Sequence, residues 1–481
     1  MSSKPTIPGP ELEEGLDKIK DPGFLKNRAK ILLFTAISCN LFGNMGFTAL
    51  NVAMPDIERD MGLSAPELSW IIMACMLAMA AFSAPLARVS DIVGRRKVTI
   101  IGLWVAIAGS IGSALSPNYT IFVLTRALTG IGLITFFTTI MAMVASAYPP
   151  GARGKVLGLT IGAVYVSLSM GPTVGGLLVF KFGWESIFWF SAISLVPSLV
   201  LIHLVQGEDP LEDSPLDLLG TILWTLALGL GFAGFASLPA PWAIAAMAVG
   251  LLLFVVFVLR SFKIESPLID LSLFTRSRRF TFSSGAAFIS YLASFSITML
   301  LSLYFQYSKG LSPLITGFVL TAQPLFQAVL TPIAGRLSDR VDPGVLGSVG
   351  LGVILMGILI IAIFISPSAP LPLIITAMCL CGAGFALFSA PNSNAIFSSV
   401  PPRRMGQASG VISVMRLTGQ ISSVAITTLV FSLVIGAGEI TPEKYPDFIK
   451  ATKVLFWIFA PLCFLAILAS LARGAPNEAK S

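Results

Sequence analysis

LARVSDIVGRRKVT, residues 86–99, places charged side chains between two of the most apolar stretches of the chain. The charges belong to Arg88, Asp91, Arg95, Arg96 and Lys97. A short, strongly basic segment between two long apolar runs is typical of a loop that joins two membrane-spanning helices on the cytoplasmic side.

The composition is that of a membrane protein. Of the 481 residues, 55% are hydrophobic and only 11% are charged, whereas about a quarter are charged in an average soluble domain. Fourteen apolar runs are each close to the ~20 residues that span a bilayer as a helix. The predicted spans are 31–53, 69–87, 98–116, 119–147, 156–180, 186–205, 217–237, 241–260, 281–305, 312–335, 345–366, 371–398, 407–435 and 451–472. The break between the seventh and eighth spans depends only on Pro239 and Pro241.

The distribution of basic residues predicts the orientation. An even number of spans puts both termini on one side of the membrane. With the N-terminus inside, 23 Lys and Arg residues fall on the cytoplasmic side and 6 on the outer side, and Arg126 and Arg416 lie within spans. We therefore expect a multi-pass protein of the cell membrane with both termini in the cytoplasm. The net charge of +7 follows from this bias and is no evidence for a nucleic-acid partner.

An internal repeat organises the chain. PPGARGKVLG (149–158) recurs as PPRRMGQASG (401–410), and ARVSD (87–91) recurs as GRLSD (335–339). At the first offset, two glycines of the fourth span match two of the twelfth, namely Gly130 with Gly382 and Gly132 with Gly384. Duplicated helical bundles in a membrane are the signature of secondary transporters, whose substrate sites lie between the halves near the midplane.

The predicted fold class is an all-α polytopic membrane protein with two six-helix bundles and a two-helix insert. The predicted segments are a cytoplasmic tail (1–29), an N-terminal bundle (30–206), the insert (207–263), a C-terminal bundle (264–473) and a second tail (474–481).

Four motifs carry a resemblance to a known family. RVSDIVGRRK (88–97) resembles the loop signature between helices two and three of the major facilitator superfamily. LTRALTGIG (124–132) resembles the Arg-x-x-x-Gly-x-Gly element of helix four, and MGPTVGG (170–176) resembles the antiporter element of helix five. TALNVAMP (48–55) is similar to an element of the fourteen-helix drug:proton antiporters. The resemblance implies the major facilitator fold and export of drug-like compounds.

The resemblance implies a gate in the 88–97 loop. Asp91 is placed to accept hydrogen bonds from a facing helix N-terminus and to pair with Arg95, while Gly94 permits a tight turn. Such a contact would close the cytoplasmic side and break when the halves rock. The second copy keeps Asp339, followed by Arg340, but has Asp342 and Pro343 where the first has Gly94 and Arg95, so its contact should be weaker. The alternative is that the basic residues only fix the topology.

Arg126 is a functional candidate because a guanidinium inside a span is costly unless it is paired or faces water. Its repeat partner is Met378, so the fold does not demand the charge. The family resemblance implies a role in proton coupling and gating; the alternative is a structural bond between helices. Arg416, ten residues into its span, is expected to line the cavity. Close helix packing, and with it the antiporter function of the family element, is expected at Gly171, Pro172, Gly175 and Gly176.

One departure from the family pattern affects the predicted mechanism. The related drug antiporters usually carry an Asp two residues before the Thr of the helix-one element, where this chain has Gly46. No Asp or Glu lies deep in a predicted span, although proton relays normally use buried carboxylates. Coupling would then use Asp91, Asp56 or Glu58 at helix ends, or would be absent. A cavity with arginines and no carboxylate favours neutral, amphipathic or anionic substrates over cations.

Helical spacing predicts residues that line the cavity. The polar and aromatic candidates are Asn40, Asn44, Thr48, Asn51, Tyr291, Phe295, Gln323, Gln327, Asn392 and Arg416. Hydrogen bonds between helices explain any single polar residue nearly as well, and aromatic residues often serve only packing.

Three functions remain open. The first is an exporter of small amphipathic compounds that works by alternating access and is driven by proton influx, as a monomer in the lipid bilayer. The second is a uniporter or exchanger for neutral or anionic metabolites or lipids on the same fold. The third is a receptor or intramembrane enzyme, which the single His and the scattered Cys residues disfavour. No metal or cofactor is expected.

Overall fold

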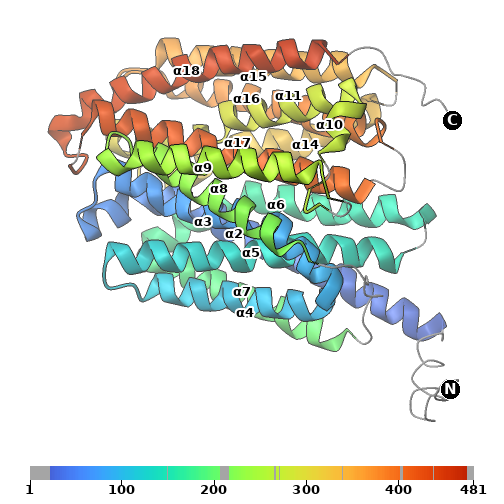
Figure 1. Ribbon diagram of the computed structural model, residues 1–481. Helices are drawn as coiled ribbons and strands as arrows, with labels where there is room; N and C mark the ends of the chain where they lie inside the picture. Colours follow the sequence, from blue (N-terminus) through green and yellow to red (C-terminus); the bar gives the residue numbers. More distant parts are fainter. Residues whose placement is uncertain are drawn as a thin grey trace, which may run out of the picture.

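The computed structural model describes residues 22–148, 150–205, 216–264, 267–269, 271–338, 340–400, 405–436 and 438–473. Within these residues the secondary structure is helical (Figure 1). The helices are α2 (Pro22–Met61), α3 (Ala65–Val93), α4 (Arg95–Ala114), α5 (Tyr119–Ala147), α6 (Pro150–Phe182), α7 (Glu185–Leu204), α8 (Leu218–Ala236), α9 (Pro241–Ser261), α10 (Ser272–Arg276), α11 (Arg278–Ser294), α12 (Ile297–Leu303), the π-helix η1 (Tyr304–Ser308), α13 (Pro313–Leu320), α14 (Ala322–Leu337), α15 (Pro343–Phe364), α16 (Leu371–Phe397), α17 (Met405–Val434), the 3₁₀-helix η3 (Pro442–Lys444) and α18 (Tyr445–Leu471).

The predicted number of spans is confirmed. In the described part of the chain, fourteen helical segments are long and apolar enough to cross a membrane. The break at the two prolines is real, because α8 ends at Ala236 and α9 begins at Pro241. In Figure 1, α2 begins and α18 ends on the same side of the bundle. We call this side the predicted inner end and the opposite side the predicted outer end.

Three spans differ from the predicted form. Helix α2 has 40 residues and runs to Met61, well beyond the expected boundary at residue 53. The ninth span breaks after Ser294, because the backbone N–H of Ser296 donates a hydrogen bond to the side-chain oxygen of Ser423 at 3.1 Å instead of to its own helix. The tenth span breaks at Thr321, where Pro324 cannot donate to the carbonyl of the preceding turn.

The repeat is visible in equivalent glycine contacts. A Cβ added to Gly132 of α5 would lie 2.2 Å from the nitrogen of Ala106 on α4, and one added to its repeat partner Gly384 would lie 2.7 Å from the nitrogen of Ile354 on α15. Ala106 and Ile354 are themselves separated by 248 residues, the second repeat offset found in the sequence. The same close packing of helices is therefore built twice.

The other repeat-related glycines agree with this arrangement. An added Cβ would lie 2.2 Å from the carbonyl oxygen of Cys75 at Gly130, and 2.1 Å from that of Gln323 at Gly382. Cys75 on α3 and Gln323 on α14 are again 248 residues apart. Backbones approach this closely only where a side chain is missing, which is how small residues hold helices together in lipid.

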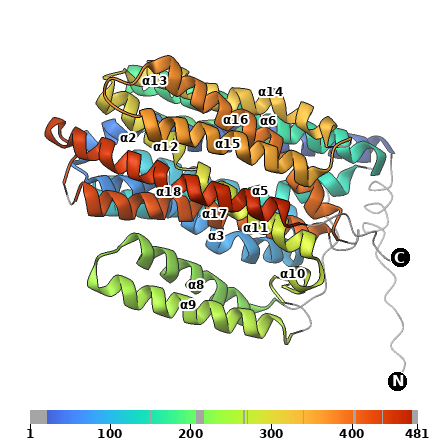
Figure 2. The ribbon, with the colours of Figure 1, turned by 90° about the horizontal axis from the view of Figure 1, so that it is seen from above.

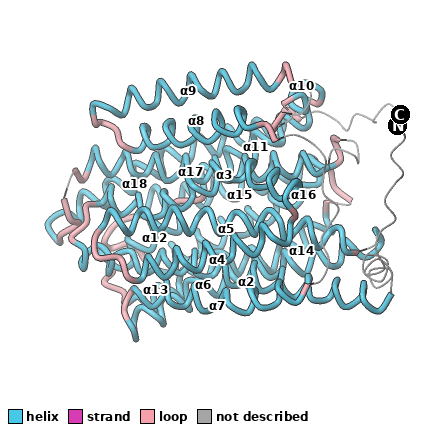
Figure 3. Tube along the Cα trace, turned by 60° about the horizontal axis from the view of Figure 1, so that its bottom comes forward, coloured by secondary structure: helices cyan, strands magenta, loops and turns pink. Residues whose placement is uncertain are grey.

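Helices α8 and α9 form a pair at the edge of the bundle (Figures 2 and 3). Helix α8 contacts α3 of the N-terminal half (α2–α7) and α17 of the C-terminal half (α11–α18), and the Thr225 hydroxyl donates to the Ala81 carbonyl at 3.3 Å. Helix α9 packs mainly on α8 and exposes large apolar side chains, such as Leu251 and Leu252. The pair therefore covers one of the two seams between the halves and presents α9 to lipid.

Gly132→Ala should destabilise the protein by about 1–3 kcal/mol, because the new methyl group overlaps the backbone of α4. The measurement is the thermal unfolding midpoint of the purified protein in detergent. Gly158→Ala is the matched control, since no atom lies within 4 Å of the added Cβ. Equal midpoints for the two variants would contradict the close packing.

Candidate functional site

At the predicted outer end, side chains of the C-terminal half bond to the backbone of α2. The Ser302 hydroxyl of α12 donates to the carbonyl of Asn51 at 2.6 Å, and the Gln306 amide of η1 donates to the carbonyl of Val52 at 2.9 Å. The carbonyl of Asn51 is available because Pro55, four residues later in the helix, has no N–H to donate. The proline of the TALNVAMP element thus creates an acceptor that the other half uses.

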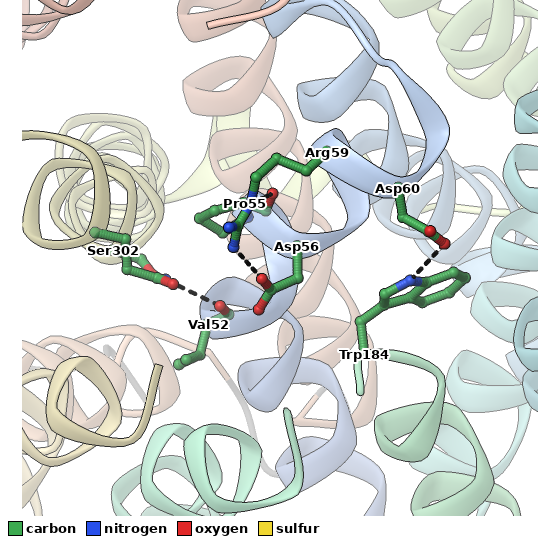
Figure 4. A network of polar contacts seen from close by, with 8 residues as sticks. Val52, Pro55, Asp56, Arg59, Asp60, Trp184 and Ser302 are labelled. Carbon is green, nitrogen blue, oxygen red and sulfur yellow. Dashed lines mark hydrogen bonds and ion pairs between the residues drawn. The ribbon is translucent and has the colours of Figure 1, made fainter. Parts of the chain in front are cut away.

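The last turn of α2 carries further polar contacts at this end. Figure 4 shows Arg59 directed to Asp56, with which it forms an ion pair, and Trp184 donating its indole N–H to Asp60 at 3.0 Å. Glu58, on the same turn, accepts the backbone N–H of Ile440 from the segment after α17 at 2.6 Å. The Glu58–Ile440 bond joins the two halves, as the bonds of Ser302 and Gln306 do, and together these three bonds close the predicted outer end.

The antiporter element lies at the second seam. A Cβ added to Gly171 or Gly175 would collide with Thr48 or Ala49 of α2, so α6 packs on α2 within the same half. Gly176 faces the other half, because its added Cβ would lie 2.5 Å from the carbonyl oxygen of Pro313.

The seam is reinforced from the opposite side. A Cβ added to Gly317 of α13 would lie 2.2 Å from the carbonyl oxygen of Pro172, and the hydroxyls of Thr173 and Thr321 lie 2.7 Å apart. The halves thus approach to backbone contact along α6 and α13.

The charged loop has the predicted turn. Gly94 separates α3 from α4 with φ 113°, a conformation that favours glycine. Asp91 pairs with Arg95 at 2.8 Å, as expected. Arg96 instead donates to the carbonyls of Ile202 and His203 at the end of α7. In the second copy, Arg340 is exposed and Asp339 lies outside the described residues.

The C-terminal half also places arginines at the end of its last helix. Arg278 donates to the carbonyl of Ala472 at 3.1 Å. Arg473 is only 3% exposed, and this burial, with the nearby charge of Arg279, lowers the pKa of its guanidinium to about 10, while Asp342 acts in the opposite direction. Basic side chains therefore cap helix C-termini at the predicted inner end in both halves.

Arg126 is buried inside the N-terminal half. It is 4% exposed, and its guanidinium lies 5.5 Å from the centre of the Phe188 ring. Among the described residues, its Nε and Nη2 have no hydrogen-bond partner. A cation–π contact offsets about 0.5–2 kcal/mol, which does not cover a cost of about 2.5–3.5 kcal/mol for arginine at the centre of a membrane helix. The guanidinium keeps unused hydrogen-bonding capacity.

Aromatic side chains of both halves meet near the middle of the helices. Tyr291 of α11 lies 5.2 Å from Phe385 of α16 between ring centroids, and it is within electrostatic range of Arg416 of α17 and Tyr165 of α6. Phe295, directly after α11, lies 6.4 Å from Phe47 of α2 between ring centroids. We call the five aromatic residues and Arg416 together the central aromatic cluster. All six side chains are partly exposed, although they lie within the bundle. The members are Phe47, Tyr165, Tyr291, Phe295, Phe385 and Arg416.

The other predicted cavity residues form no hydrogen bond to the central aromatic cluster within the described part of the chain; most donate to backbone carbonyls. The side chains of Asn40, Asn44, Thr48 and Asn51 donate to carbonyls of their own helix, for instance Asn40 to Ala36 at 2.9 Å. Asn392 donates to the carbonyl of Ser283 at 3.2 Å and thereby joins α16 to α11. Gln323 packs where α14 meets α16, and its buried Oε1 has no partner among the described residues; Gln327 is partly exposed.

Several residues of these contacts were not predicted from the sequence as site or cavity residues, among them Ser302, Gln306, Ile440, Tyr165, Phe47 and Phe385. Glu58 was considered only as a helix-end carboxylate, because α2 was expected to end before it. The spacing of Met54, Ile57 and Met61 was the available signal that the helix continues. Ser302 and Gln306 gave no signal, since their acceptors are backbone carbonyls of a distant helix.

Comparison with known proteins identifies the family to which this fold belongs. The family model of the Major Facilitator Superfamily matches residues 36–284 and 283–481. A riboflavin transporter of Clostridioides difficile is 26% identical over 87% of this chain and 92% of its own length. The multidrug resistance protein Stp of Mycobacterium tuberculosis is 28% identical over 83% of this chain and 75% of its own, and a lincomycin resistance protein of Listeria monocytogenes is 24% identical over 87% and 88%.

Solved structures show the same fold. A POT family transporter in complex with 5-aminolevulinic acid has a TM-score of 0.70 at 14% identity, covering 93% of this chain and 96% of its own. A D-xylose-proton symporter has a TM-score of 0.68 at 14% identity, covering 94% and 99%. With two matched regions that together cover nearly the whole described chain, the protein belongs to the major facilitator superfamily of membrane transporters.

Proposed function

We propose that this protein is a secondary active exporter of small amphipathic compounds, that it works by alternating access, and that proton influx drives it. The observation that carries the proposal is the central aromatic cluster, to which both halves contribute. Phe47 and Tyr165 come from one half, and Tyr291, Phe295, Phe385 and Arg416 come from the other. A group bound there would touch both halves, which is what alternating access requires of a substrate site.

The orientation is part of the proposal. Both termini lie in the cytoplasm and the protein is a monomer of the cell membrane. The charge distribution supports this placement, because Arg88, Arg95, Arg96, Arg278 and Arg473 all belong to the end of the bundle called inner here. The single bonds between the halves described above lie at the other end, so the described state has its outer side closed.

The cluster favours planar neutral or anionic substrates. Aromatic faces stack on planar rings, and Arg416, within electrostatic range of Tyr291, supplies a positive charge that would bind a carboxylate or repel an organic cation. The names of the relatives support planar neutral or anionic substrates only in part, because both drug-resistance proteins and a riboflavin transporter occur among them.

A second candidate function is a uniporter or exchanger without proton coupling. It is favoured by the absence of the helix-one acid, which has a steric reason. A Cβ added to Gly46 would lie 2.0 Å from Oγ and 3.0 Å from Cβ of Ser191 on α7. The Ser191 side chain thus occupies the space that a Cβ at position 46 would need.

The proposed function is tested with purified protein in liposomes under an imposed pH gradient. Net substrate transport should depend on the gradient in the wild type. Arg126→Ala should lower this flux by at least about tenfold, because it removes a charge that is costly to bury and available for bonding.

Lys181→Ala, which removes an exposed cation at the end of α6, is the control and should keep the wild-type flux. Export that ignores the pH gradient but responds to counter-substrate would favour the exchanger. Normal turnover by Arg126→Ala would show that this arginine is structural.

Arg416→Gln should weaken the binding of an anionic amphipathic compound by about tenfold and leave its neutral analogue nearly unchanged, because only the charged contact is lost. Ligand-induced shifts of the unfolding midpoint report both affinities. Equal loss for both compounds would remove Arg416 from substrate recognition.

Gly46→Asp should lower the thermal unfolding midpoint, because the new side chain collides with Ser191. Combining it with Ser191→Gly should recover most of the loss, since that change removes both colliding atoms. A fully stable single variant would show that α2 and α7 are less closely packed at this position.

A further inference from the structure

Glu58 is a buried carboxylate in a contact between the two halves. The residue is only 2% exposed. Its Oε1 accepts the N–H of Ile440, which lies 382 residues away in the C-terminal half. Opening the outer end must break this bond and expose the carboxylate.

The surroundings of Glu58 do not compensate a negative charge. Its Oε2 is buried and has no hydrogen-bond partner among the described residues. Glu439, next to the bonded amide, adds a second negative charge nearby. Arg59 is the cation that acts on Glu58, but its side chain is 69% exposed and is paired with Asp56.

Two other acidic side chains at this end have hydrogen-bond partners. Asp60 accepts the indole N–H of Trp184, and Glu67 of α3 accepts the backbone N–H of Ser64 at 2.8 Å. The lack of a hydrogen-bond partner for Oε2 of Glu58 is therefore not shared by every carboxylate at the predicted outer end. An ionised carboxylate pays a large desolvation cost in such a place unless a proton neutralises it.

We propose that Glu58 takes up the proton at the outer mouth, and that the two halves close over it in its neutral form. This inference rests on the proposed proton-driven export and names the group that receives the proton. A proton from the outer solution adds to Oε2 and converts the carboxylate to a carboxylic acid, while Oε1 continues to accept from Ile440. No other bond changes.

The direction of the effect follows from burial. The closed state holds Glu58 away from water and binds the proton more tightly than the open state does. A lower external pH therefore favours closure, and a higher pH favours opening. In an exporter driven by proton influx, loading the proton from outside would thus close the outer mouth and return the empty transporter to the inner side.

The test measures the distance across the outer mouth in nanodiscs. Spin labels are placed at Pro117→Cys, between α4 and α5, and at Ser368→Cys, between α15 and α16; both positions are exposed. Cys379, which is partly exposed, is replaced by Ala, and the other four cysteines are buried. The distance distribution is recorded from about pH 5 to about pH 8.

The wild type should shift to the longer distance as the pH rises. Glu58→Gln should keep the short distance at every pH, because the amide is neutral and its carbonyl still accepts from Ile440. The control Asp56→Asn changes the neighbouring, partly exposed carboxylate and should keep the wild-type response. A pH response that persists in Glu58→Gln, or that is lost in Asp56→Asn instead, would overturn the proposal.

A second variant tests the same idea without changing Glu58. Glu439→Gln removes the neighbouring negative charge, so Glu58 should ionise more easily and the transition should move to lower pH. An unchanged or upward shift would contradict the assigned group. This result remains decisive if Glu58→Gln fails to fold.

The two proposals fail in different ways. Flux in liposomes that ignores the pH gradient, together with a mouth that still responds to pH through Glu58, would reject proton-driven export only. Full gradient-driven flux in Glu58→Gln would reject the role of Glu58 and leave the proposed function standing.

Discussion

Backbone contact at glycine is the constraint on which this structure depends. Lipid chains are as apolar as the helix surfaces, so burial of apolar area gives helices little reason to associate within a bilayer. Close packing at missing side chains replaces that driving force. Gly132 and Gly384 hold corresponding helices together in the two halves, while Gly176 and Gly317 bring the halves themselves into contact. The same device therefore builds the bundles and the seam between them.

The contacts between the halves at the predicted outer end differ in kind from those within a half. Inside each half, glycine contacts are accompanied by broad packing of long helices, such as α4 on α5 and α15 on α16. At the outer end the halves share single hydrogen bonds, such as that of Ser302. A few bonds of about 0.5–1.5 kcal/mol each can break in a rocking motion that leaves the bundles intact, which fits a transporter of this family.

Much of the fold could be predicted from the sequence, because the signals are local. Apolar run length fixed the number of spans, and the repeated motifs located the two copies. The turn at Gly94 and its Asp91–Arg95 pair were also predictable, since all three residues lie within five positions. The end of α2 was predicted too early, because its last turns are polar and only Met54, Ile57 and Met61 continue the apolar face.

The candidate site was less predictable, because its contacts join distant parts of the chain. Tyr291 and Phe295 were expected near the cavity, but the approach of Phe47 and Tyr165 from the other half depends on how the bundles dock. The polar face of α2 was predicted to line the cavity, and this stays a prediction; its amide N–H groups donate to carbonyls of their own helix. Pro55 has one further consequence. The acceptor it frees is a main-chain carbonyl, so a mutational scan along α2 would pass over the bond to Ser302 unless it restored the N–H at position 55 itself.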